Sequence, residues 1–339
     1  MSKLRSYLGL PISLALFPKA IFHPPSLQKV SVYNSLQSSP TLPSRFSLLS
    51  WNVQYCASRA YHFFYDGGPD VHASQTAVEE TIEKIGSFLQ EQQFDIALLQ
   101  EVDRNAKRTQ HIDQVQALRA VLPQSSVAQA TYFRSPFVPI PLKNPMGRVH
   151  TVLLTLSRYH IKKAYRHQLA LLKESSFRQA FNLKRAILET EYQTAKGPLF
   201  VANIHLSAFS FGDGTLHKQV QQIEEWIQNR PPNSRWIVAG DFNLLPLGDD
   251  PQRLLTPNEY EQASSNPLHK LLPKYNSVFP STIENRTYLP FGHEKPDRTL
   301  DYILFSDGLE VEDAKVHSHI LFSDHLPISA RFRIVDLLK

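Results

Sequence analysis

The sequence predicts a layered α/β protein with helices outside and β-sheets inside. Apolar, β-branched and aromatic runs typical of strands alternate along the 339 residues with amphipathic segments typical of helices. The composition, 42% hydrophobic and 20% charged, lies far from that of disordered or coiled-coil chains. A single cysteine, Cys56, excludes an intrachain disulfide and a cysteine-based metal site. We therefore expect a globular protein that is stabilised by packing.

The elements can be taken in order from residue 46, where the first apolar run begins. We expect strands at Phe46–Val53, Ile96–Leu99, Val149–Ser157, Phe181–Tyr192, Leu199–Ile204, Trp236–Ala239, Leu300–Phe305 and Ile328–Val335. Apolar side chains at three- and four-residue steps predict helices within Ala73–Gln93 and Thr215–Gln228, and a weaker pattern predicts a third at Ile112–Leu122. Because no repeat, low-complexity tract or linker divides residues 46–339, we expect them to form one domain.

Residues 1–45 are expected to form an N-terminal arm of different character. Residues 1–50 contain five Lys or Arg and no Asp or Glu, and an apolar run, Leu8 to Phe17, follows the first two basic residues. This pattern suits a targeting, secretion or membrane-contact segment, while several prolines suit an irregular arm, so localisation stays open. No run reaches the roughly 18 apolar residues needed to span a bilayer, so we expect peripheral membrane contact at most.

The arm also accounts for the net charge. The chain has 36 Lys or Arg and 31 Asp or Glu. Five of the basic residues lie within residues 1–50, so residues 51–339 carry 31 charges of each sign. A neutral body offers no basic stripe for a long nucleic-acid duplex. If the body acts on an anionic substrate, it needs a local positive charge, and a metal ion is the obvious source.

Short polar residues occur at or just after the ends of several predicted strands. They stand in the segments 50–53, 98–102, 203–207, 240–243, 300–303 and 323–327. Four of them are the carboxylates Glu101, Asp241, Asp301 and Asp324, and gathering these in one cleft would be unfavourable without a cation. Oxygen and amide ligands favour Mg²⁺ or Mn²⁺ over zinc. We expect Glu101 to be the chief ligand, assisted by Asp324.

Taken together, the motifs WNV, LQEVD, NIHLSA, GDFN, LDYIL and SDHLPI resemble those of the endonuclease/exonuclease/phosphatase superfamily. That superfamily includes pancreatic-type deoxyribonuclease, apurinic endonucleases, inositol-polyphosphate phosphatases and bacterial sphingomyelinases. The resemblance covers about residues 46 to 335. It implies a four-layer α/β sandwich, in which two packed β-sheets are flanked by helices and hold a cleft at one end.

The resemblance also implies a reaction, the metal-dependent hydrolysis of a phosphoester, most often a phosphodiester, by in-line attack of water. Asn52 would lie beside Glu101 and help to place the metal, and Asn243 would hold the phosphate or the water. Asp241 would orient and deprotonate the water, although His325, paired with Asp301, could also act as the base. The remaining family positions are His205, which would donate to a phosphate oxygen, and Asp324, which could bind a second ion or help the leaving group.

Two differences from the family motifs argue against the apurinic-endonuclease branch of the superfamily. Apurinic endonucleases carry an acid where this chain has Gln54, and generally a tyrosine where it has His205. The His form is shared by deoxyribonuclease, inositol phosphatase and sphingomyelinase-like members. Nucleic acid, phospholipid and inositol phosphate therefore all stay open as substrates, and a catalytically inactive scaffold is a remote alternative.

Three segments are expected to decide specificity. Tyr55–Pro69 and Tyr132–Met146 are rich in aromatic and apolar residues, which could stack on bases, enter a lipid interface or simply fill a satellite core. In the insertion Leu247–Arg298, Arg286 and Tyr288 are candidates for substrate binding. We expect the protein to act as a monomer.

Overall fold

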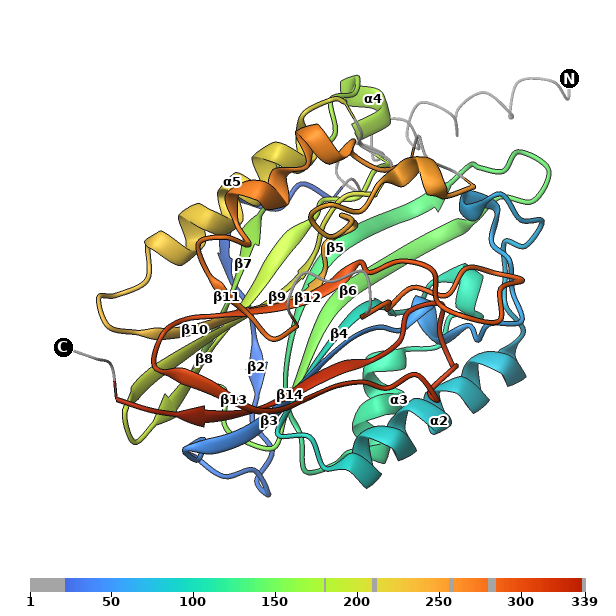
Figure 1. Ribbon diagram of the computed structural model, residues 1–339. Helices are drawn as coiled ribbons and strands as arrows, with labels where there is room; N and C mark the ends of the chain where they lie inside the picture. Colours follow the sequence, from blue (N-terminus) through green and yellow to red (C-terminus); the bar gives the residue numbers. More distant parts are fainter. Residues whose placement is uncertain (1–21, 180, 209–211, 256–258, 280–284, 337–339) are drawn as a thin grey trace, which may run out of the picture.

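The computed structural model describes residues 22–179, 181–208, 212–255, 259–279 and 285–336, and shows two seven-stranded sheets packed face to face (Figure 1). Sheet A has the order β1 (Leu27–Lys29), β7 (Lys163–Gln168), β8 (Ala186–Thr194), β9 (Gly197–His205), β10 (Arg235–Asp241), β12 (Asp301–Phe305) and β11 (Asn276–Ser277). Sheet B has the order β13 (Leu309–Val316), β14 (Ile328–Ile334), β3 (Arg45–Asn52), β4 (Ile96–Asp103), β6 (Gly147–Ser157), β5 (Ser126–Val138) and β2 (Val32–Tyr33).

Helices cover the outer face of each sheet and complete four layers. The helices α2 (Gln75–Gln92) and α3 (Gln114–Val121) pack on sheet B, and α5 (Thr215–Gln228) packs on sheet A (Figure 1). A one-turn helix, α4 (Ser176–Gln179), and 3₁₀ turns occupy the connections. These turns are Gln54–Cys56, Phe64–Asp66, Lys107–Thr109, Pro251–Arg253, Ala263–Ser265 and Pro267–Lys270. The four-layer α/β sandwich is therefore confirmed.

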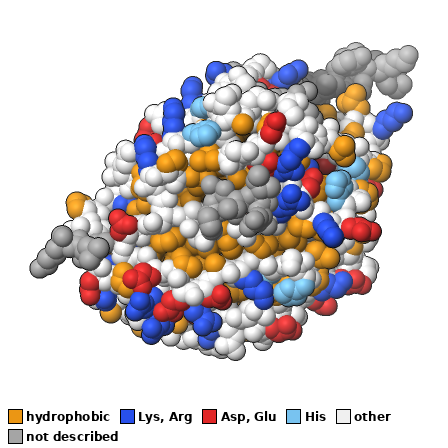
Figure 2. Space-filling view, in the orientation of Figure 1, with side chains coloured by type: hydrophobic (Ala, Val, Ile, Leu, Met, Phe, Trp, Pro, Cys, Tyr) orange, Lys and Arg blue, Asp and Glu red, His pale blue; other side chains and the backbone are white. Residues whose placement is uncertain are grey.

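Three apolar cores hold the layers together. The inner core lies between the sheets, where Leu48 and Leu98 of sheet B share a cluster with Val201 and Ile237 of sheet A. Figure 2 has the same orientation as Figure 1, and it shows hydrophobic side chains gathered across the middle of the view, where the two sheets lie next to each other in Figure 1. Each outer core joins a sheet to its helices, as the burial of the α2 stripe around Ile85 shows.

The predicted strands and helices are all present, with ends displaced by a few residues. The structure also contains strands that were not predicted. The prediction missed β5, β7 and β13, as well as the short strands β1, β2 and β11. The segment Tyr132–Met146, expected as a loop, begins inside β5, and the predicted strand Phe181–Tyr192 forms only from residue 186 onward. No helix among the described residues is long and apolar enough to cross a membrane.

The second half of the N-terminal arm is bound to the sandwich. Within residues 22–45, β1 pairs with β7 of sheet A, and β2 pairs with β5 of sheet B. Leu42 is 1% exposed and belongs to the inner core. The apolar run Leu8 to Phe17, on which the targeting hypothesis rests, lies outside the described residues.

Candidate active site

Three polar side chains lie next to one another at one end of sheet A. In the ladder, Asp241 of β10 is opposite His205 of the parallel strand β9 and Asp301 of the antiparallel strand β12. Neighbours in register point to the same face of a sheet. Strand pairing alone therefore brings together three residues that lie 36 and 60 positions apart in the sequence.

Gly240 allows this part of the ladder to close. Its φ is +149°, and a Cβ built on it would lie 1.9 Å from the carbonyl oxygen of Ile204 in β9. Any other residue would push β9 and β10 apart just before His205 and Asp241.

Sheet B contributes Asn52 and Glu101. Asn52 ends β3 opposite Gln100 of β4. At Glu101 the β4–β6 ladder contains an irregularity between Leu99 and Val102, and the Glu101 backbone adopts a φ of +59°. A bulge of this kind redirects a side chain, and its strained backbone is typical of functional sites.

The loop that carries Asp324 and His325 is fixed to the end of β3. The Trp51 indole nitrogen donates to the carbonyl oxygen of His325 at 2.8 Å, and the Ser323 hydroxyl donates to the carbonyl oxygen of Asn52 at 2.7 Å. Asp324 and His325 are thereby held beside the end of β3.

Asp241 is the centre of the hydrogen-bond network. Its Oδ2 accepts a bond from Asn52 Nδ2 at 3.0 Å, and its Oδ1 accepts one from the Asn243 backbone N–H at 2.9 Å. The Nε2 atoms of His205 and His325 lie 3.4 and 3.5 Å from Oδ2. This carboxylate therefore receives donors from both sheets.

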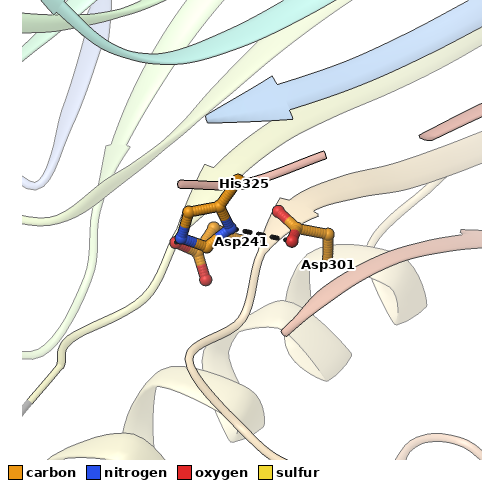
Figure 3. A group of neighbouring side chains, drawn as sticks. All are labelled: Asp241, Asp301 and His325. Atoms are coloured by element: carbon orange, nitrogen blue, oxygen red, sulfur yellow. Dashed lines mark hydrogen bonds and ion pairs between the residues drawn. The ribbon is translucent and has the colours of Figure 1, made fainter. Parts of the chain in front are cut away.

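Asp301 and His325 form the expected pair. His325 Nδ1 lies 2.8 Å from Asp301 Oδ2, which leaves Nε2 directed toward Asp241 (Figure 3). The Thr287 hydroxyl also donates to Asp301 Oδ2, at 2.6 Å. Both side chains are almost completely buried.

Burial and charge shift the proton affinities of these groups. Burial, together with the Asp324 carboxylate, raises the pKa of Glu101 to about 7, and burial raises the pKa of Asp241 to about 6. Burial disfavours a charged ring at His325, but the Asp301 and Asp241 carboxylates hold its pKa well above the usual range. At His205, burial and then the Arg185 guanidinium lower the pKa well below that range.

The donor set fits a hard divalent cation at Glu101. Among the described residues no side chain donates a hydrogen bond to the Glu101 carboxylate, and His205 Nε2 lies 3.8 Å from its Oε1. Burial, with a smaller contribution from the Asp301 carboxylate, also raises the pKa of Asp324. Ligand atoms of Asp241, Asp301 and His325 lie within 4.8 Å of one another, but Nδ1 of the histidine is already bonded to Asp301. Two mutually repelling carboxylates with few donors are the ligands that Mg²⁺ or Mn²⁺ prefers.

The structure brings together all the motif residues selected from the sequence but separates the two substrate-binding candidates. Asn52, Glu101, His205, Asp241, Asn243, Asp324 and His325 line one cleft of about 630 Å³, with Asp301 directly behind His325. Tyr288 also lines it, with its ring against that of His325 at 4.9 Å. Arg286 is exposed and is not part of the lining.

Several supporting residues were not assigned a role from the sequence. Asn203 donates to the carbonyl oxygens of Leu99 and Leu154 and accepts from Gln100, so it joins the sheets beneath the site. Arg185 lines the cleft and is 7% exposed. The basic pair 184–185 inside the predicted strand 181–192 was the sequence signal for it.

The sequence was compared with models of known protein families and with curated proteins. A model of the Endonuclease/Exonuclease/phosphatase family matches residues 49–325. No curated protein matches the chain significantly.

Solved structures match the fold at low sequence identity. An endonuclease/exonuclease/phosphatase from Beutenbergia cavernae is 17% identical, with a TM-score of 0.56, and the match covers 86% of this chain and 72% of that one. The catalytic domain of human Nocturnin, with a bound sulfate anion, is 17% identical with a TM-score of 0.52, and the match covers 90% and 98% of the two chains. ANGEL2, described as a 2′,3′-cyclic phosphatase, is 17% identical with a TM-score of 0.53 and the same coverage.

Proposed function

The chain belongs to the endonuclease/exonuclease/phosphatase family, and on that premise we propose that it hydrolyses phosphodiesters with water as the nucleophile and Mg²⁺ or Mn²⁺ as cofactor. The observation that carries the proposal is the convergence of Asn52, His205 and His325 on the Asp241 carboxylate, next to Glu101. A purely structural cluster would not need the two imidazoles of His205 and His325. It would also not need the Glu101 carboxylate, to which no described side chain donates a hydrogen bond.

In this proposal Asp241 receives the proton of the attacking water. Its two oxygens are oriented by the Asn52 amide and the Asn243 backbone, so the carboxylate is held in one position. Preorganisation of this kind lets a general base act without reorientation during the reaction.

The imidazoles are placed to bind the phosphate. Asp301 fixes the His325 tautomer at Nδ1, so Nε2 can donate to a phosphoryl oxygen. His205 Nε2 faces the same space from β9. Glu101, with Asp324, would hold the divalent ion, which when bound supplies positive charge to a phosphate oxygen and to the departing alkoxide.

The proposal is tested with bis(p-nitrophenyl) phosphate as a minimal diester. We expect turnover with Mg²⁺ or Mn²⁺, loss of turnover in EDTA, and recovery when the metal is restored. Glu101→Gln should reduce the rate at least about 100-fold because the metal site loses its chief charge. The matched control is Glu83→Gln, which changes an exposed glutamate on α2 and should keep the wild-type rate.

Circular dichroism and thermal unfolding would establish that both variants are folded. Activity that persists in EDTA, or equal rates for the two variants, would contradict the proposal. Metal binding without turnover of any phosphoester would support the scaffold alternative instead.

A further inference from the structure

The cleft above the catalytic residues has mostly apolar walls. One wall comes from the segment that contains Phe63 and Phe64, a second from the β5–β6 hairpin with Val138 and Ile140, and a third from the loop that contains Phe291. The catalytic groups lie on the floor of the cleft, and many of the side chains around them are apolar or aromatic.

Large apolar side chains remain exposed at the mouth of this cleft. Ile140 and Phe291 line it and are 52% and 49% exposed, and Leu142, at the tip of the same hairpin, is 86% exposed. The loop that forms this tip, residues 139–146, lies beyond the ends of β5 and β6 (Figure 1). A grouped apolar surface beside a pocket is typical of a binding site.

The opposite rim is held in place by specific contacts. The His62 ring stacks on Phe291 with centroids 4.5 Å apart and an 8° angle between the planes. Arg59 donates to the carbonyl oxygen of His293 at 3.2 Å. The apolar mouth is therefore supported by contacts between loops that are distant in the sequence.

The charges of the cleft do not suit a polyanion. Its described lining contains six Asp or Glu, four Arg and no Lys. Two of the arginines are engaged by carboxylates, Arg108 by Asp103 and Arg298 by Asp297. A nucleic-acid strand would need a row of available basic groups along its phosphates.

Arg185 is the cation suited to a single phosphate. It is 7% exposed, and its Nη1 is buried without a hydrogen bond to any described residue. The guanidinium lies 5.1 Å from the centroid of the Tyr132 ring, which in turn packs on the His205 ring at 5.8 Å. A buried guanidinium nitrogen without a hydrogen-bond partner is unfavourable unless an acceptor such as a phosphate oxygen completes it.

We propose that the substrate is a phospholipid, whose one phosphodiester reaches Arg185 and the catalytic floor while its apolar chains lie against the cleft walls and the hairpin tip contacts the lipid surface. This inference rests on the proposed function. Water would add across one P–O bond to give an alcohol and a phosphomonoester, so no further reactant is required.

The test compares one soluble and one lipid diester at fixed Mg²⁺. The probes are bis(p-nitrophenyl) phosphate and dihexanoylphosphatidylcholine, the latter below and above its critical micelle concentration. We expect the lipid rate to rise at least about tenfold when micelles form. A duplex and a single-stranded oligonucleotide, and inositol phosphates, serve as competing substrates.

The variant is Ile140→Glu/Leu142→Glu, and its matched control is Leu27→Glu/Leu36→Glu. The control leucines are 55% and 102% exposed and lie outside the cleft. We expect the hairpin variant to lower the ratio of lipid to soluble turnover at least about tenfold, while the control keeps the wild-type ratio.

Co-sedimentation with phosphatidylcholine vesicles in EDTA tests docking separately from catalysis. We expect the wild type and the control to sediment with the vesicles, and the hairpin variant to lose at least four fifths of the bound protein. Lipid turnover, or sedimentation, that is equal in all three proteins would overturn the inference.

The two proposals fail in different ways. Turnover of the soluble diester with preference for an oligonucleotide or inositol phosphate would retain the hydrolase and overturn the phospholipid. No turnover of any phosphoester, combined with hairpin-dependent vesicle binding, would overturn the hydrolase and support the docking surface.

Discussion

Gly240 is the residue on which the position of Asp241 most directly depends. Because its missing Cβ makes room for the carbonyl oxygen of Ile204, Gly240→Ala forces a 1.9 Å contact onto backbone that cannot move aside. We expect a loss of about 3 kcal/mol or more of unfolding free energy, measured by urea denaturation, and a reduced kcat.

Gly197→Ala is the control for this change. Gly197 also has a positive φ, +97°, but nothing lies within 4 Å of the Cβ that would be added. It should lose only about 1–2 kcal/mol, because only the backbone conformation is strained. Equal losses for the two alanines would show that steric contact at Gly240 is unimportant.

At the scale of residues, the sequence indicated which side chains lie together where polar residues follow strand ends. His205, Asp241 and Asp301 could be found because each ends or begins an apolar run, and parallel or antiparallel pairing then aligns them. Arg185 and Thr287 could not, because their importance depends on contacts across the fold with Tyr132 and Asp301. Arg286, chosen for its charge alone, does not line the cleft.

At the scale of elements, the contribution of the segment 22–45 to the stability of the sandwich can be tested by changing a single side chain. Leu42 is 1% exposed in the inner core, whereas Leu36 of the same segment is fully exposed. We expect Leu42→Ala to cost about 2–5 kcal/mol and Leu36→Ala less than about 0.5 kcal/mol, measured by chemical denaturation. Similar small losses for both would mean that this segment adds little to the stability of the sandwich.

The strands that escaped prediction share a physical cause. The sequence of β13 reads LEVEDAKV and is mostly solvent-facing because the strand lies at an edge of sheet B. The strand β5 contains Pro136 and two irregularities in its ladder with β6, which interrupt the alternation of polar and apolar residues. Central strands such as β10 are buried on both faces and were therefore easy to recognise.

For the whole molecule, we expect stability to fall in acid partly through His317. Its ring packs against Phe88, and burial, with Lys315 and His319 nearby, lowers its pKa to about 4. The unfolded chain, with a histidine pKa of about 6.5, binds more protons between these values, so the unfolding free energy falls as pH drops from about 6.5 to 4.

His317→Gln should make this decline shallower, because glutamine can replace the bond to Ser329 without titrating. Urea unfolding at several pH values and constant Mg²⁺ would measure this change. Burial also lowers the pKa of His150 to about 4, but His150 is unchanged and contributes equally to both proteins. Parallel curves for wild type and variant would contradict the assignment.

The interleaving of the two sheets along the chain has a consequence for protein synthesis. Sheet B is begun by β2 and β3 but receives β13 and β14 only after all of sheet A has been made, and Asp324 and His325 lie in the loop between β13 and β14. A ribosome that stalls, or a frameshift, anywhere before residue 334 therefore releases a polypeptide without a finished sheet B. We therefore expect a product that is shortened at this end of the chain to be inactive.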